Sequence, residues 1–190
     1  MSETLKQNWN EVKKQLKYCN DKELLGIIHN LYGLNKSNKE YLNFKFLAGN
    51  SKEHKEQLVK KTIDSINLAW EKTFHDPYAY GGNTVIAKVT PIKAYVIAYK
   101  KAIGVDLGYV NILIEYICSG SECLYSNCYE RSDSILNSIN SMAKELFTLM
   151  KDNSDYINKF TELQIKKIKD FTETYYIYDD VFALYQEIKL

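Results

Sequence analysis

Arginine, proline and glycine are scarce in this sequence of 190 residues. The two prolines and eight glycines leave few points at which a helix must stop, because these residue types are the strongest helix breakers. Arg131 is the only arginine, and arginine is the side chain that holds phosphate groups through two parallel hydrogen bonds. The sequence therefore favours long regular elements and argues against phosphate recognition.

Long apolar runs are missing as well. No stretch reaches the roughly 18 uninterrupted apolar residues that a membrane-spanning helix needs. Residues 1–9 contain no apolar core of a secretion signal. Four cysteines without an export signal are expected to be reduced thiols. We therefore expect a soluble, cytoplasmic protein that does not bind membranes.

The short motifs of nucleotide, dinucleotide, zinc-protease and hydrolase sites are also absent. Cys118, Cys123 and Cys128 are five residues apart, whereas structural zinc sites use pairs two to four residues apart. His75 and Asp76 could form a base and its orienting carboxylate, although a histidine at a helix end explains them equally well. We expect no metal ion, no cofactor and no catalytic residues.

Helical periodicity is what the sequence contains most clearly. Hydrophobic residues make up 45% of the chain and charged residues 26%, as in an ordinary folded domain. Apolar residues recur at three- and four-residue intervals, and no segment predicts a confident strand. We predict a single all-α domain, residues 1–190, with about nine helices in antiparallel hairpins that form a compact bundle or a short solenoid-like array. The expected helices lie near residues 5–16, 21–33, 38–49, 52–74, 91–103, 107–118, 128–150, 157–171 and 179–188.

Residues 90–118 are expected to form the centre of this fold. Thr90 and Pro91 suit the start of a helix and Gly104 suits its end. The next helix, from Leu107, is apolar over so much of its circumference that it should be largely buried. The short link predicts an antiparallel hairpin. Its open end, where predicted loops 76–89 and 119–127 meet, is our candidate functional surface.

Two pairs of residues have the spacing of a capping box. Asn20 precedes Glu23 by three residues, and Ser37 precedes Glu40 by three residues. In a capping box these side chains bind backbone N–H groups that are free at the start of a helix. We expect a helix to begin at each pair.

The charges are divided unequally along the chain. Residues 1–101 contain 17 lysines and 10 acidic residues, a net charge of +7, whereas residues 102–190 contain 8 basic and 14 acidic residues, a net charge of −6. One interpretation is that opposite charges meet where the halves pack. The other is a basic surface that binds nucleic acid or an acidic partner. The proposed nucleic-acid contacts are Lys52, Lys55, Lys60 and Lys61.

Tyrosine is abundant, with 16 residues. Tyrosines near the predicted loops and the tail could form an interaction surface, because tyrosine is enriched at interface hot spots. Alternatively, their rings cap the ends of the helical core. The candidates for this surface are Tyr78, Tyr80, Tyr125, Tyr129, Tyr175, Tyr176 and Tyr178.

Four segments also resemble an uncharacterised family of small bacterial proteins, a domain of unknown function. They are LKYCNDKELLGIIHNLYGLNKSNKEYLNFKFL at 16–47, IKAYVIAYKKAIG at 92–104, LIEYICSG at 113–120 and KFTELQIKKIKDFTETYYIYDDVFALYQEI at 159–188. The resemblance implies a bacterial, all-helical protein and supplies no activity.

Three functional hypotheses follow from the sequence. The first is a helical protein that acts without catalysis, as a protein-interaction module or as a subunit of a homo-oligomer. The second is a nucleic-acid-binding protein that uses its lysine-rich N-terminal half. The third is a metal-dependent enzyme built on His75, Asp76 and the cysteines.

Overall fold

The computed structural model describes residues 3–47, 52–73, 89–127, 133–174 and 177–188. Nine α-helices and one short 3-10 helix occupy most of these residues, and none of these residues lies in a strand. The predicted all-α fold of about nine helices is confirmed. The helices are α1 Glu3–Leu16, α2 Asp21–Leu34, α3 Lys36–Leu47, α4 Lys52–Thr73, α5 Val89–Ile103, α6 Leu107–Asn127, α7 Asp133–Asp152, α8 Glu162–Thr174 and α9 Asp179–Gln186, with the 3-10 helix at Ile157–Lys159.

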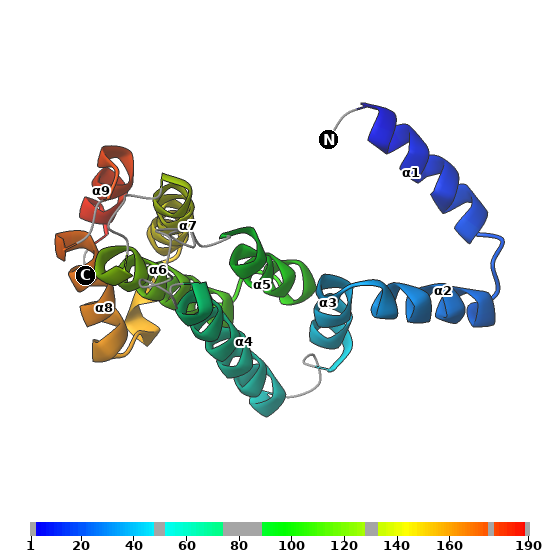
Figure 1. Cartoon of the computed structure of the whole chain (residues 1–190), viewed down its shortest axis with the longest axis horizontal. Helices are drawn as coiled ribbons and strands as arrows, with labels where there is room; N and C mark the ends of the chain where they lie inside the picture. The colour runs from blue at the N-terminus through cyan, green and yellow to red at the C-terminus, as the bar shows by residue number, and fades with distance from the viewer. Residues whose placement is uncertain (1–2, 48–51, 74–88, 128–132, 175–176, 189–190) are drawn as a thin grey trace, which may run out of the picture.

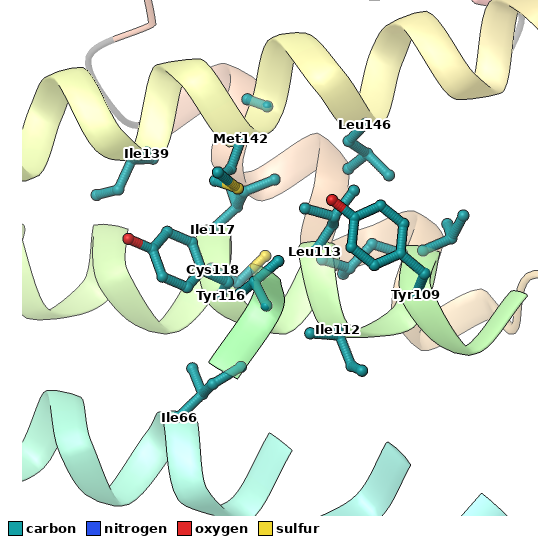
Figure 2. Packing of buried hydrophobic residues seen from close by; sticks show 14 of the residues in the cluster. Ile66, Tyr109, Ile112, Leu113, Tyr116, Ile117, Cys118, Ile139, Met142 and Leu146 are labelled. Atoms are coloured by element: carbon teal, nitrogen blue, oxygen red, sulfur yellow. The ribbon is translucent and has the colours of Figure 1, made fainter. Parts of the chain in front are cut away.

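Helix α6 lies at the centre of the packing. It contacts α4, α5, α7 and α8. Its residues Leu113 and Tyr116 are completely buried. Figure 2 shows α6 between α4, which contributes Ile66, and α7, which contributes Ile139 and Met142. The predicted burial of this helix is confirmed, because apolar residues around its circumference meet a neighbouring helix on several sides.

The predicted end of α5 at Gly104 is confirmed. Gly104 has a φ of 101°, the left-handed conformation in which a glycine can end a helix. The predicted start is wrong, because α5 extends from Val89 and Thr90 lies inside it instead of capping it. However, α5 packs chiefly against α3, whereas α6 packs chiefly against α4 and α7. The centre of the fold is therefore α6 with its neighbours, not the α5–α6 pair alone.

The predicted loop at residues 119–127 is wrong, because α6 continues to Asn127. The small residues there bring α6 close to α4. An added Cβ atom on Gly120 would lie 2.9 Å from Cζ2 of Trp70, and the Ser119 hydroxyl donates a hydrogen bond to Oδ1 of Asn67 at 2.7 Å. Small and polar residues that suggested a loop are thus contact residues between two helices.

Helices α1 and α2 extend away from the helices around α6, as the blue segments of Figure 1 show. Helix α2 packs against α3, and none of its residues is buried. Its predicted capping box is confirmed. The Asn20 N–H donates to Oε2 of Glu23 at 2.8 Å, and the Glu23 N–H donates to Oδ1 of Asn20 at 3.0 Å. None of the described helices combines the length and the apolar character that crossing a membrane requires.

The second predicted capping box is wrong. Helix α3 begins at Lys36, and Asn35 caps it by accepting a hydrogen bond from the Asn38 N–H at 2.8 Å. Asparagine is as good an N-cap as serine, so a start two residues earlier is physically equivalent. Glu40 is consequently not a capping residue, and its carboxylate pairs with Lys36 at 3.7 Å.

Within the described residues, two ion pairs join the basic and the acidic halves of the chain. Lys55 of α4 lies 3.0 Å from Asp106, and Lys100 of α5 pairs with Glu145 of α7. The hydroxyl of Tyr109 also donates to Glu145, at 2.7 Å. These contacts support the interpretation that opposite charges meet where the two halves pack.

Candidate functional site

Three helices of the described chain enclose a groove of about 570 Å³, here called the α3–α4–α5 groove. Helices α3 and α4 line it with residues at the same relative positions, i, i+3, i+4, i+7, i+8 and i+11, which form one face of a helix. On α3 these are Lys36, Lys39, Glu40, Asn43, Phe44 and Leu47. On α4 they are His54, Gln57, Leu58, Lys61, Thr62 and Ser65, and α5 adds Tyr95.

The charged groups of the groove interact with one another. Lys36 donates a hydrogen bond to the Tyr95 hydroxyl and lies 4.8 Å from the centre of the Tyr95 ring. This hydrogen bond is the main cause that raises the pKa of Lys36. Burial raises the pKa of Glu40, while the ammonium groups of Lys36 and Lys61 act in the opposite direction. A half-buried carboxyl group between two cations is the kind of perturbed group found at binding sites.

Sequence reasoning missed the α3–α4–α5 groove, although part of its signal is visible. Lys36, Lys39 and Glu40 have the spacing of one helix face, and so do His54 and Lys61. The sequence contains no sign that these two faces turn toward each other, because that depends on the packing of α3 on α5 and of α5 on α4.

A second groove of about 790 Å³ lies between α3, α5 and α7. Two lysines, Lys93 and Lys101, line it together with Tyr41, Ile97 and small or polar residues. Its lining contains no acidic side chain. Because binding sites combine an apolar surface with a few converging polar groups, the α3–α4–α5 groove is the stronger candidate.

The four lysines proposed for nucleic acid do not form one basic surface. Lys52 pairs with Glu56 at 3.9 Å, and Lys55 pairs with Asp106. Lys61 lines the α3–α4–α5 groove, whereas the exposed Lys60 does not. Positions 52 and 55 share one side of a helix, whereas position 61 lies on the side opposite position 52. The arrangement adds no support to the nucleic-acid hypothesis.

Among the tyrosine candidates, Tyr178 is the one whose side chain lies in the described part of the chain, and it is 37% exposed. The Tyr178 hydroxyl donates to Oδ1 of Asn137 at 2.5 Å, and its backbone N–H donates to Oδ1 of Asn140 at 2.8 Å. These bonds fix the start of α9 on α7, which is a structural role. Tyr125 lies in α6 instead of in a loop. Its side chain lies outside the described residues, as do Tyr78, Tyr80, Tyr129, Tyr175 and Tyr176.

The two buried cysteines of α6 face different helices. Cys118 Sγ donates a hydrogen bond to the carbonyl of Lys167 at 3.7 Å, and Cys123 Sγ donates to the carbonyl of Trp70 at 3.5 Å. Burial, reinforced by Glu115, raises the pKa of the Cys118 thiol to about 12, which keeps it protonated. Within the described ranges, no three His, Cys, Asp or Glu side chains are placed to hold a metal ion. His75, Asp76 and Cys128 lie outside them.

Comparison with known proteins supplies no relative. No family model matches the chain, and no curated protein and no solved structure is significantly similar to it. The resemblance to a bacterial family therefore stays a prediction.

Proposed function

We propose that this protein acts by binding another protein, or a second copy of itself, through the apolar faces of α1 and α2. The observation that carries the proposal is that these two helices are amphipathic but pack their apolar residues against little of the described chain. In an ordinary globular domain such faces supply the core. Here they are available for a partner.

The apolar side chains of α2 are unusually exposed for a helix of this composition. Leu25 is 66% exposed and Leu34 is 72% exposed, and Ile27, Ile28 and Leu31 each expose more than a third of their surface. These residues cover about half of the circumference of an ideal helix. Contiguous apolar patches of this kind mark protein interaction sites on soluble proteins.

Helix α1 continues the pattern. Trp9 and Val12 lie one above the other at i and i+3, and they are 54% and 49% exposed. Glu11 and Lys14 occupy other sides of the helix, and Lys13, four residues after Trp9, borders this face. Tryptophan contributes more binding energy at interfaces than most residues, because it buries a large ring at little conformational cost.

The chain exposes more surface than a compact protein of its mass. The chain exposes 12884 Å², whereas a compact protein of 22.1 kDa exposes roughly 9,300 Å². The extended helices α1 and α2 contribute to this difference (Figure 1). A typical stable interface covers about 800 Å² on each partner.

Light scattering coupled to size exclusion tests the proposal, together with capture of partners from a native lysate. The variant Leu25→Gln with Leu34→Gln makes the exposed face of α2 polar. Its matched control is Leu163→Gln on α8, because Leu163 is 63% exposed, nearly as much as Leu25. We expect the α2 variant to weaken self-association or partner capture about tenfold, the loss typical of an interface hot spot, and the control to leave it unchanged.

Two results would contradict the proposed interaction surface on α1 and α2. A protein that stays monomeric at about 0.1 mM, a concentration at which weak self-association with a micromolar Kd is visible, and that captures no partner would refute the proposal. So would equal losses in the α2 variant and in Leu163→Gln, because the effect would then be one of general surface polarity.

A further inference from the structure

The α3–α4–α5 groove combines an apolar base with a basic rim. Phe44 is only 6% exposed and Leu58 is partly buried against the core. Lys36 and Lys39 of α3 face the groove from one side, and Lys61 of α4 faces it from the other. We propose that this groove binds a small organic anion, in which a phosphate or carboxylate group is attached to an apolar ring or chain.

The charge of the groove favours an anionic ligand. Its lining contains three lysines and one glutamate, so two positive charges remain when His54 is neutral. Lysine attracts anions as a point charge and imposes no planar geometry on them, unlike arginine. The groove therefore selects for negative charge, and both a carboxylate and a phosphate group satisfy it.

Glu40 occupies the place in which the anionic group of a ligand would be most stable. Its carboxylate lies 3.7 Å from the ammonium group of Lys36, and Lys61 attracts it electrostatically. Burial already disfavours the ionised form of Glu40. A ligand anion and Glu40 thus compete for the same lysines, so removing the charge of Glu40 should strengthen binding.

The size of the groove fits a small molecule. Ligand pockets in proteins range from about 300 to 1,000 Å³ and combine apolar walls with a few polar groups, and this groove has about 570 Å³. Its lysines face one hollow from two sides, whereas a nucleic-acid strand is bound by cations spaced along its path. The groove is separate from the exposed faces of α1 and α2, so this inference and the proposed function fail independently.

Nuclear magnetic resonance of the uniformly ¹⁵N-labelled full-length protein tests the inference. The protein is titrated separately with phenyl phosphate, benzoate, phenol and inorganic phosphate. We expect phenyl phosphate or benzoate to shift backbone amides of α3, α4 and α5 beside the groove. Phenol lacks the charge and inorganic phosphate lacks the ring. Each should therefore bind at least threefold more weakly than phenyl phosphate, because each makes only part of its contacts. Phenyl phosphate and benzoate together distinguish a phosphate ligand from a carboxylate ligand.

Variants of the groove make the test specific. Lys61→Ala should weaken binding at least threefold, because it removes one of three cations, and Lys39→Ala should act in the same direction. Lys60→Ala is the matched control, since Lys60 is the neighbouring exposed lysine outside the groove. Glu40→Gln should strengthen binding at least twofold, because it keeps the shape of the side chain and removes the competing charge.

Several results would overturn the inference. One is the absence of amide shifts beside the groove at about 10 mM of both aromatic anions, a concentration that detects even millimolar affinity. Another is phenol binding as tightly as phenyl phosphate, since charge would then play no part. Equal losses in Lys60→Ala and Lys61→Ala would show attraction to general positive charge. Weaker binding in Glu40→Gln would show that Glu40 does not compete with the ligand for the lysines of the groove. A short single-stranded oligonucleotide that binds more tightly and depends equally on Lys60 would show nucleic-acid binding instead.

Discussion

A methyl group added at Gly120 tests the close contact between α4 and α6. An ideal Cβ atom there would lie 2.9 Å from Cζ2 and 3.2 Å from Cε2 of Trp70, and 3.3 Å from Cδ1 of Ile139. The Trp70 ring has little room to move, because it is 1% exposed and packs edge-to-face on Tyr116 at a centroid distance of 5.5 Å. The Gly120→Ala variant must therefore displace a rigid buried ring.

Two opposing contributions determine how much Gly120→Ala changes the free energy of unfolding. Alanine favours a helix interior over glycine by about 1 kcal/mol, whereas overpacking a core costs about 1–3 kcal/mol. The steric cost should prevail, because contacts below 3.0 Å with ring carbons are strongly repulsive. We expect Gly120→Ala to lower the free energy of unfolding by about 1 kcal/mol, which corresponds to about 2–4 °C in melting temperature for a chain of this length.

Thermal unfolding followed by far-UV circular dichroism measures the effect. Gly26→Ala on α2 is the matched control, because no heavy atom outside its own helical turn lies within 4 Å of an added Cβ atom there. This control should keep the melting temperature or raise it, since only helix propensity acts. If Gly120→Ala raised the melting temperature as well, α4 and α6 would not approach each other as closely as the structure shows.

Two further predictions concern buried tyrosines. Burial is the largest cause that raises the pKa values of Tyr99, Tyr109 and Tyr116 above the usual value near 10, so the unfolded chain releases these protons at a lower pH than the folded one. The contribution of these tyrosines to the free energy of unfolding should be fully present below pH 10 and should be lost as the pH rises above it. Ionisation of all tyrosines, seen as full tyrosinate absorbance, with an unchanged circular dichroism spectrum would contradict this. The Tyr116 hydroxyl and the Ser138 hydroxyl share a buried hydrogen bond of 2.7 Å, so Tyr116→Phe should cost about 1–2 kcal/mol by leaving Ser138 unpaired. The double variant with Ser138→Ala should cost less than the sum of the single variants in urea unfolding, and strict additivity would show that the bond is not formed.

Local chemistry in the sequence predicted many features of the helices. The capping pair Asn20 and Glu23 and the terminal Gly104 act over a few residues, so their roles could be assigned without tertiary contacts. The same reasoning failed at residues 119–127. Ser119 and Gly120 look like loop residues in isolation, but in the helix they allow the approach of Trp70.

The candidate site was predicted less well for a similar reason. The abundance of lysine in one segment predicts nucleic-acid contacts, but the structure shows that Lys52 and Lys55 pair with acidic residues while Lys61 lines a groove. The tyrosine surface is predicted from positions beside expected loops and near the tail. Tyr178, the candidate whose side chain is described, is bound to α7 by residues about 40 positions earlier in the chain.

The sequence by itself determined that this protein is helical, approximately where its helices lie and which sides of them are apolar. These properties depend on interactions within a few residues, whose periodicity is visible along the chain. Only the tertiary structure decided which apolar sides became core, as in α6, and which stayed exposed, as in α2. It also decided that Lys36, Glu40 and Lys61 meet in one groove, because distant residues come together only when particular helix faces pack.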